Sequence, residues 1–218
     1  MNHHPPPSGF FITLEGGEGA GKSTQIQLLA SALRDAGHEV VVTREPGGSS
    51  GAEAIRGLIL TGGFGFSAVT EALLFSAARL DHLEKTIRPA LQRGAVVLCD
   101  RFFDSTRAYQ GASGAADPAI LSALETIAVG ATRPDLTLIF DLPPADGLRR
   151  AAARRGHGQA DRFESEALGF HEKLRAGFLA IAQHEPERCR VIDAARPVEA
   201  IAGDVKAIVL AKLGARRA

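Results

Sequence analysis

The segment FFITLEGGEGAGKST, residues Phe10–Thr24, joins an apolar run to a helix-period run through a glycine-rich turn. Its middle part, Gly16–Ser23, fits the pattern G-x-x-x-x-G-K-S. Glycines allow successive backbone N–H groups to face a polyphosphate, and the dipole of the helix that follows favours negative charge there. The segment therefore predicts a phosphate-binding loop between a buried strand and a helix.

Two polar side chains of this loop have expected tasks. Lys22 is expected to reach the β- and γ-phosphates of ATP, and the Ser23 hydroxyl is expected to ligate Mg²⁺. Asp100, which follows the apolar run Ala95–Cys99, is expected to hold the Mg²⁺ shell. The residues expected to bind the donor nucleotide are Gly16, Gly17, Glu18, Gly19, Ala20, Gly21, Lys22, Ser23 and Thr24.

Further apolar runs recur along the chain, separated by helix-period segments. They are Glu39–Thr43, Ala95–Cys99, Leu136–Asp141 and Arg190–Ile192, and they are rich in β-branched residues. Continuous apolar runs are typical of strands buried on both faces, and strands that alternate with helices pair in parallel. The sequence therefore predicts an α/β fold, a three-layer sandwich with a central, five-stranded parallel sheet.

The expected helices and loops place a site at one edge of this sheet. The helices are Ser23–Ala36, one that opens at Asp117-Pro118, Asp146–Arg155, Glu164–His184 and Val198–Leu213. Ligands of such sheets bind at the carboxyl ends of the strands. The segments after the expected strands are polar or glycine-rich: EGGEGAGKST, REPGGSSG, DRFFDSTRAYQG, DLPPADG and DAARP.

Length and composition bound the class of protein. The 218 residues are enough for one domain with a sizeable core, and we expect a poorly ordered leader at 1–9 and a single domain at 10–218. The 25 basic residues balance 25 acidic ones, which gives no reason to expect a nucleic-acid partner. No apolar stretch approaches the ~20 residues that cross a bilayer. Two distant cysteines form no disulfide framework, so we expect a cytoplasmic protein without a membrane partner.

Phosphate-binding loops occur in GTPases, in motor and repair ATPases and in small-molecule kinases. A GTPase would carry N-K-x-D for guanine, which the sequence lacks. A motor ATPase usually ends a strand with Asp-Glu, whereas this chain has Asp100-Arg101 there. Arg101 cannot act as a base and suits a second phosphate, which favours phosphoryl transfer to a phosphorylated acceptor. The alternative is that Asp100 and Arg101 merely form a surface ion pair.

Five motifs in register resemble those of thymidylate kinases, the enzymes that phosphorylate dTMP to dTDP. They are LEGGEGAGKST (Leu14–Thr24), TREPGGSSGAEAIR (Thr43–Arg56), EALLFSAARLDH (Glu71–His82), DRFFDSTRAYQG (Asp100–Gly111) and DRFE (Asp161–Glu164). The resemblance runs from about Phe10 to the end of the chain. It implies the P-loop nucleoside-monophosphate kinase fold, ATP with Mg²⁺, dTMP as acceptor, a step in dTTP biosynthesis and a homodimer. For the dimer, Phe64–Leu83 is apolar enough to contribute a helix face, although its residues equally suit the monomer's own core.

The resemblance also implies which side chains bind dTMP. Phe75 would stack on the thymine, and Arg79, four residues later on the same helix face, would hydrogen-bond the base. Without the resemblance, a core phenylalanine and a solvated arginine are the simpler interpretation. Arg101 would grip the acceptor phosphate and Arg56 would be a second contact to it, unless Arg56 is solvated.

Other residues of the resemblance would surround the nucleoside. Thr106 and Gln110 would lie beside the base edge, and Tyr109 would either pack against the 2′ carbon of the sugar or belong to the core. Glu18 would lie near the sugar 3′-hydroxyl and the Mg²⁺ water shell, because a carboxylate among phosphate-binding amides needs another partner. Phe102 departs from the Tyr or His that thymidylate kinases more often have, and loses a polar tip.

Gly19 stands where some thymidylate kinases have a basic residue, so the chain resembles the bacterial type that supplies arginines from a mobile lid. The lid is expected at about 149–164, which holds five arginines around Gly-His-Gly. On charge alone, a solvated helix end is the simpler interpretation. A phosphoryl transfer needs positive charge on the γ-phosphate and exclusion of water. The expected catalytic residues are therefore Lys22, Arg101, Arg154, Arg155, Arg162 and Glu18.

Two other functions stay open. A deoxynucleoside kinase or another nucleoside-monophosphate kinase would use a different acceptor, and a nucleoside acceptor needs a base for its 5′-hydroxyl rather than a phosphate clamp. A switch or repair ATPase would hydrolyse ATP under the control of a partner. The neutral net charge and the Asp100-Arg101 pair argue against such an ATPase.

Overall fold

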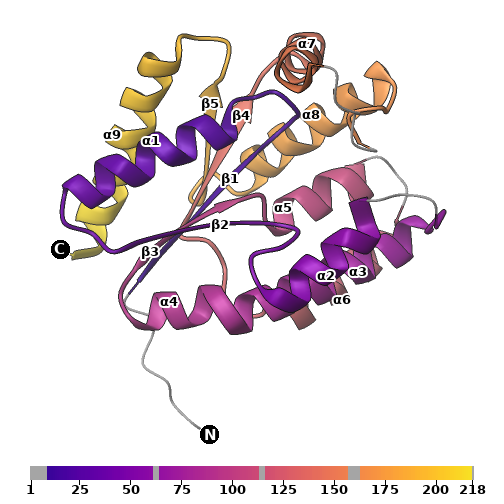
Figure 1. Cartoon of the computed structure of the whole chain (residues 1–218), viewed down its shortest axis with the longest axis horizontal. Coiled ribbons are helices and arrows are strands. Elements are labelled where there is room, and N and C mark those ends of the chain that lie inside the picture. The colour runs from indigo at the N-terminus through magenta and orange to yellow at the C-terminus, as the bar shows by residue number, and fades with distance from the viewer. Residues whose placement is uncertain (1–8, 61–63, 113–115, 157–162, 218) are drawn as a thin grey trace, which may run out of the picture.

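The computed structural model describes residues 9–60, 64–112, 116–156 and 163–217. Its strands form one parallel sheet in the order β2-β3-β1-β4-β5 (Figure 1). The strands are β1 Phe10–Gly16, β2 Val40–Arg44, β3 Val96–Asp100, β4 Leu136–Asp141 and β5 Cys189–Asp193. The predicted five-stranded parallel sheet is confirmed. The expected leader falls outside the described residues except for Gly9, whose N–H donates to the Leu91 carbonyl.

Helices connect the strands. They are α1 Lys22–Asp35, α2 Ser50–Leu60, α3 Ala68–His82, α4 Arg88–Gln92, α5 Phe103–Thr106, α6 Pro118–Ala128, α7 Pro144–Arg155, α8 Leu168–His184 and α9 Val198–Arg217. Two π-helical segments, η1 Leu83–Ile87 and η2 Arg107–Ala112, continue α3 and α5. The helix expected from Asp117 begins as predicted, with the Asp117 carboxylate accepting from the Ala119 N–H at 2.8 Å.

One predicted helix starts too early. The expected helix Glu164–His184 begins at Leu168 in the structure, after a turn. Ala167, the residue before it, offers no side-chain cap. Glu164 accepts hydrogen bonds from Arg154 and Arg155 of α7 instead of starting the helix.

The sheet is covered on both faces because alternate residues of its central strand point in opposite directions. Phe10, Ile12 and Leu14 pack with α1 and α9 in one layer. Phe11 packs on the opposite face with residues of η1 and α4. Figure 1 shows α1 and α9 side by side above the sheet and α2, α3 and α6 grouped on the other side.

A buried ion pair joins α5 to Arg188, the residue that directly precedes β5. Arg188 donates to both carboxylate oxygens of Asp104, at 2.6 and 3.0 Å, and the Asp104 side chain is fully buried. The Arg188 guanidinium also lies over the Phe103 ring, 5.0 Å from its centroid. This pair fixes the start of the segment that follows β3, which carries much of the site.

Of the helices within the described ranges, none has both the length and the apolar character that a bilayer crossing requires.

Candidate active site

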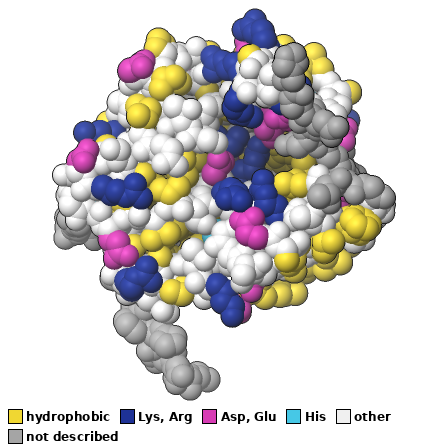
Figure 2. Space-filling view, in the orientation of Figure 1, with side chains coloured by type: hydrophobic (Ala, Val, Ile, Leu, Met, Phe, Trp, Pro, Cys, Tyr) yellow, Lys and Arg dark blue, Asp and Glu magenta, His cyan; other side chains and the backbone are white. Residues whose placement is uncertain are grey.

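The carboxyl ends of β1, β2 and β3 open into a cavity of about 260 Å³. Figure 2 shows basic side chains gathered around a hollow in the middle of the face in view. Residues from five segments far apart in the sequence meet there. The predicted site residues that line the cavity are Glu18, Ser23, Arg56, Phe75, Arg79, Asp100, Arg101, Thr106, Tyr109 and Gln110.

The phosphate loop closes around its own lysine. The Lys22 Nζ donates to the carbonyls of Gly16 and Gly17, at 3.0 and 2.9 Å. Burial and, to a smaller extent, the positive charge of Arg101 together lower the pKa of Lys22 to about 8. The ammonium is therefore held in place, and an entering phosphate would give it a stronger partner than two carbonyls.

Gly19 packs directly against the first turn of α7. Its φ is +67°, and a Cβ built on it would lie 2.0 Å from the Gly147 carbonyl oxygen. Gly147 is equally restricted, because its own Cβ would meet the Glu18 carbonyl oxygen at 2.3 Å. A side chain at position 19 is therefore incompatible with this packing, which brings the phosphate loop and the helix of the expected lid together.

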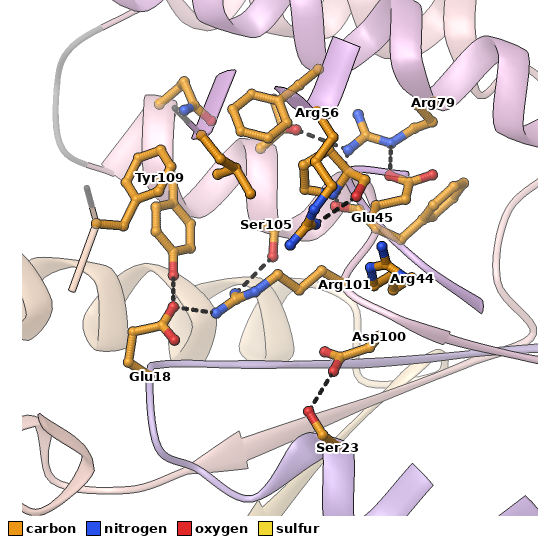
Figure 3. Close-up of a pocket in the computed structure, with 17 residues that line it drawn as sticks. Glu18, Ser23, Arg44, Glu45, Arg56, Arg79, Asp100, Arg101, Ser105 and Tyr109 are labelled. Atoms are coloured by element: carbon orange, nitrogen blue, oxygen red, sulfur yellow. Dashed lines mark hydrogen bonds and ion pairs between the residues drawn. The ribbon is translucent and has the colours of Figure 1, made fainter. Parts of the chain in front are cut away.

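Two expected Mg²⁺ ligands lie side by side. The Ser23 hydroxyl, at the start of α1, donates to Asp100 Oδ2 at 3.0 Å (Figure 3). A hydroxyl and a carboxylate next to a phosphate loop are the hard oxygen donors that Mg²⁺ takes together with substrate phosphates. The residues present thus fit the ion. The described residues contain no cluster of three or more His, Cys, Asp or Glu that could hold a metal without such phosphates.

Arg101 reaches from the end of β3 to the phosphate loop. Its Nη2 donates to Glu18 Oε1 at 2.6 Å (Figure 3). Its Nη1 donates to the Gly16 carbonyl at 3.1 Å. Arg101 has a φ of +67°, which is costly for a residue with a side chain and persists only where the surroundings hold it. The predicted alternative of a surface pair with Asp100 is wrong, because Arg101 is mostly buried and its carboxylate partner is Glu18.

The Glu18 carboxylate is the meeting point of two donors. The Tyr109 hydroxyl donates to the same Oε1 at 2.9 Å. Burial opposes the ionised form of Glu18, but the charges of Arg101 and Lys22 outweigh it and lower the pKa to about 2. Tyr109 itself is buried and also lines the cavity, so the two interpretations of this residue are compatible.

Glu15 supports the turn that carries Arg101, a role the sequence analysis missed. Its Oε1 accepts from the backbone N–H groups of Phe102 and Ser105, at 2.8 and 3.3 Å. Its Oε2 accepts from the Ser105 hydroxyl at 2.6 Å, and Arg101 Nη1 donates to that hydroxyl at 3.2 Å. Burial and, to a smaller extent, the negative charge of Asp104 together raise the pKa of Glu15 to about 8.

Phe75 and Arg79, both on α3, also line the cavity. Arg79 Nε donates to Glu45 Oε2 at 2.7 Å, and its Nη2 donates to Thr106 Oγ1 at 3.1 Å. Arg79 is 3% exposed, so the interpretation of a solvated arginine is wrong. Gln110 is equally buried and lines the same cavity.

Arg56 reaches the cavity from α2. Its Nη1 donates to the Pro46 carbonyl at 2.7 Å, and the side chain is half-buried. The solvated alternative for Arg56 is therefore wrong as well, since this contact holds its guanidinium beside the cavity.

Comparisons with known proteins identify the family of the chain. The family model described as thymidylate kinase matches residues 14–205. A thymidylate kinase of Caulobacter vibrioides is 60% identical over 207 residues, covering 94% of this chain and 98% of the relative. The chain belongs to the thymidylate kinase family. The predicted enzyme class and reaction, phosphorylation of dTMP to dTDP, are thereby confirmed.

Further relatives of the thymidylate kinase family bear this out. A thymidylate kinase of Bradyrhizobium sp. (strain ORS 278) is 56% identical over 201 residues, covering 92% of this chain and 89% of the relative. The crystal structure of the thymidylate kinase from Ehrlichia chaffeensis matches with a TM-score of 0.76 at 33% identity. That match covers 93% of this chain and all of the other, so the predicted kinase fold is confirmed.

The expected lid is described in part. Arg154 and Arg155 lie in the last turn of α7, where both donate to the Glu164 carboxylate. The positive charge of Arg154 also contributes to the low pKa of Glu18. Arg162, the third lid arginine expected from the thymidylate kinase resemblance, lies outside the described residues.

Sequence reasoning missed several residues that line the cavity. Arg44 and Glu45 directly follow the second strand in the REPGG motif, and Ser105 lies within DRFFDST. Their position after expected strands was the available signal. Phe163 also lines the cavity and packs edge-on against Tyr109 at 5.2 Å between ring centroids. The sequence analysis selected the neighbouring Arg162 for its charge but did not select Phe163, the aromatic residue of the same motif.

Proposed function

We propose that this chain transfers the γ-phosphoryl group of Mg²⁺-ATP to the phosphate of dTMP, with the phosphate loop holding the donor and Arg101 holding the acceptor. The observation that carries the proposal is the position of Arg101. Its guanidinium lies in one cavity with Ser23 and Asp100 at one end and Phe75 and Arg79 at the other. An acceptor phosphate bound to Arg101 would therefore lie between the donor site and the base site.

The donor side has the parts that phosphoryl transfer needs. The amides of Gly16–Thr24 would surround the β- and γ-phosphates, and Lys22 would exchange its two carbonyl partners for phosphate oxygens. Ser23 and Asp100 would hold Mg²⁺, whose positive charge would neutralise the negative charge that develops during the transfer. Lys22 is already buried in position, so it would need little reorganisation during the reaction.

The acceptor side orients dTMP and leaves its phosphate free to attack. Arg101 and Arg56 would hold the phosphate, whose second pKa is about 6, so that no strong general base is needed. Phe75 would stack on the thymine. The polar residues around the base edge would be Arg79, Thr106 and Gln110, all of which line the cavity.

Glu18 and Tyr109 would act at the sugar. Arg101 and the Tyr109 hydroxyl both donate to Oε1 of Glu18, so the other carboxylate oxygen, Oε2, takes no part in either contact. That oxygen would accept from the 3′-hydroxyl. The buried ring of Tyr109 would lie against the 2′ carbon and disfavour a ribose hydroxyl.

The lid arginines would complete the donor site. Arg154 and Arg155, together with Arg162, would place positive charge on the γ-phosphoryl group and would help to exclude water. The Arg154 guanidinium lies 3.5 Å from the Glu164 carboxylate, and its side chain is well exposed, which supports its release for another partner.

We also propose that the enzyme acts as a cytoplasmic homodimer. Three helices that pack together on one side of the molecule, α2, α3 and α6, expose large hydrophobic side chains. Leu58, Leu73 and Ile127 are 46%, 50% and 70% exposed. A second copy that covered these helices would remove this surface from water.

A coupled ADP-release assay tests the proposal. Mg²⁺-ATP is offered with dTMP, dUMP, thymidine, dCMP, AMP and GMP in turn. We expect strong dependence on dTMP with thymidine inert. Turnover of thymidine but not dTMP would assign a nucleoside kinase, and equal ADP release without an acceptor would assign an ATPase under the control of a partner.

A further inference from the structure

His82 is the most deeply buried polar side chain of α3 and has no part in the proposed reaction. It closes the EALLFSAARLDH motif, and its side chain is 0% exposed. Its Nδ1 lies 3.1 Å from Glu45 Oε1, and its Nε2 lies 2.7 Å from Thr43 Oγ1. Both ring nitrogens therefore contact residues at the end of β2: Thr43 lies within the strand and Glu45 directly follows it.

The same glutamate holds Arg79. Glu45 Oε2 accepts from Arg79 Nε at 2.7 Å, while Oε1 faces the imidazole of His82. The side chains of Glu45 and Arg79 are each 4% exposed, so water does not compete for either contact. Figure 3 shows Arg79 and Glu45 paired at the edge of the cavity. Thr43, His82, Glu45 and Arg79 thus form one continuous chain of contacts.

This chain determines which donor of Arg79 faces the ligand. Nε is taken by Glu45, and Nη2 is shared between the Phe102 carbonyl at 3.2 Å and Thr106 Oγ1 at 3.1 Å. Within the described part of the chain, Nη1 is the donor of this guanidinium that has no hydrogen-bond partner. Because the guanidinium is planar and rigid, fixing two of its nitrogens fixes the direction of the third.

The loop after β2 is shaped around the imidazole. A Cβ on Gly48, whose φ is +86°, would lie 2.3 Å from His82 Nε2 and 2.5 Å from Thr43 Oγ1. Thr86, in η1, donates to the Gly48 carbonyl at 2.7 Å. Position 48 must therefore lack a side chain for His82 to stay between the loop and α3.

Hydrogen-bond chemistry assigns the direction of the chain. An ionised Glu45 can only accept, so Nδ1–H of His82 donates to it. In the neutral ring, Nε2 is then an acceptor, and the Thr43 hydroxyl donates to it. A leucine at position 82 would leave Oε1 of Glu45 without a donor in a buried site, and the carboxylate would turn toward other donors, including Arg79.

We propose that His82 is a positioning residue for base recognition, which holds Glu45 so that Arg79 presents Nη1 to the base. This inference rests on the proposed role of Arg79. A fixed N–H donor selects a pyrimidine with an acceptor at the facing edge, such as the 4-oxo group of thymine. It rejects a 4-amino group, which is itself a donor, as in cytosine.

The test is the ratio of kcat/KM for dTMP to that for dCMP, measured at saturating Mg²⁺-ATP. We expect His82→Leu to lower this ratio about tenfold, mainly through the KM for dTMP, with the KM for ATP unchanged. His82→Gln, whose amide N–H can still donate to Glu45, is expected to restore part of the ratio. His184→Leu, at the exposed end of α8, is the matched control and is expected to leave it unchanged.

A double-mutant cycle separates positioning from a merely structural role. In an Arg79→Ala background, adding His82→Leu is expected to change the ratio less than about twofold, because the residue it positions is gone. An unchanged ratio in His82→Leu, or an equal fall in both backgrounds, would overturn the inference. If Arg79→Ala alone leaves the ratio unchanged, the proposed role of Arg79 fails and the inference fails with it, while dTMP turnover by the wild type is unaffected.

If His82→Leu does not fold, Thr43→Val tests the positioning role of His82 instead. It removes only the hydroxyl on Nε2 and leaves the contact between Glu45 and Arg79 in place. A fall of the ratio by about twofold or more would support positioning, since the ring has lost one of its two anchors. A ratio equal to that of the wild type would overturn it.

Discussion

The guanidinium of Arg101 and the carboxylate of Glu18 form a 2.6 Å hydrogen-bonded ion pair that joins the end of β3 to the phosphate loop. Their side chains are 17% and 16% exposed, so the pair is largely shielded from water. An acceptor phosphate that binds Arg101 must share this guanidinium with Glu18. In the proposed reaction, the pair would keep Arg101 oriented before dTMP enters and would leave Glu18 beside the bound sugar.

Removal of Arg101 is expected to separate donor binding from turnover. Arg101→Ala should lower kcat by at least about 10²–10³-fold, because the acceptor phosphate loses its charged partner. The Kd for ATP, measured by titration calorimetry, should change little because the amides of the phosphate loop remain. Arg196→Ala, on the surface, is the control. Loss of ATP binding in Arg101→Ala would contradict the role given to this residue.

The burial of Glu15 predicts an unusual dependence of stability on pH. Its folded pKa of about 8 lies above the model-peptide value of 4.5, so between these values the folded state binds more protons than the unfolded state. The contribution of Glu15 to stability therefore falls as pH rises from about 4.5 to 8. Glu15→Gln does not titrate and should escape this loss.

Urea unfolding of the wild type and of Glu15→Gln at pH 5.5 and 7.5 checks this sign. The free energy of unfolding of the variant should improve relative to the wild type by about 1–2 kcal/mol at the higher pH. Glu199→Gln, at an exposed position of α9, should show no such trend. A relative loss of stability of Glu15→Gln at pH 7.5 would contradict the assignment.

Asp104 and Arg188 are expected to matter for folding. Asp104→Ala removes the carboxylate that pairs with both Nη nitrogens of the largely buried Arg188, whose Nε still contacts Glu185 at 3.0 Å. Breaking a buried ion pair typically costs about 3–5 kcal/mol. The surface pair between Arg196 and Asp204 is the control, since its side chains are 38% and 54% exposed. Asp204→Ala should change the free energy of unfolding by less than about 1 kcal/mol. Equal effects of the two substitutions in urea titrations would refute this difference.

Gly19 cannot carry a side chain while it packs on Gly147. Gly19→Ala forces the loop away from α7, so we expect the affinity for ATP to fall about tenfold or more. Gly203→Ala, in α9, meets no atom within 4 Å and should be neutral or stabilising. ATP titrations of both variants provide the check, and wild-type affinity in Gly19→Ala would show that the loop tolerates a Cβ there.

The strands could be predicted because their signals are local. Each expected run lies within two residues of the observed strand, as Glu39–Thr43 and β2 Val40–Arg44 illustrate. Continuous apolar stretches need no knowledge of their neighbours. The predicted start of α8 was wrong because local signals do not show contacts between distant segments. Glu164 forms ion pairs with Arg154 and Arg155, which depend on the packing of α7.

The support of the site could not be predicted in this way. Glu15 and Ser105 are 90 positions apart, and Glu45 and Arg79 are 34 apart. Their pairing depends on β1 lying beside β3 and on α3 lying over the loop after β2, which periodicity does not specify. The residues expected to face the ligand carried motif signals that suggested a role. Glu45 and Ser105 follow expected strands, but that position did not indicate which side chain each of them holds.

Ligand binding to the wild type and to Arg101→Ala tests the central claim most directly. The Kd values of dTMP and thymidine are measured by calorimetry in the presence of a non-hydrolysable ATP analogue with Mg²⁺. We predict that the wild type binds dTMP about 100-fold more tightly than thymidine, and that Arg101→Ala narrows this gap at least about tenfold. Equal affinity of the wild type for both ligands, or a gap that Arg101→Ala leaves unchanged, would contradict the claim that Arg101 holds the acceptor phosphate.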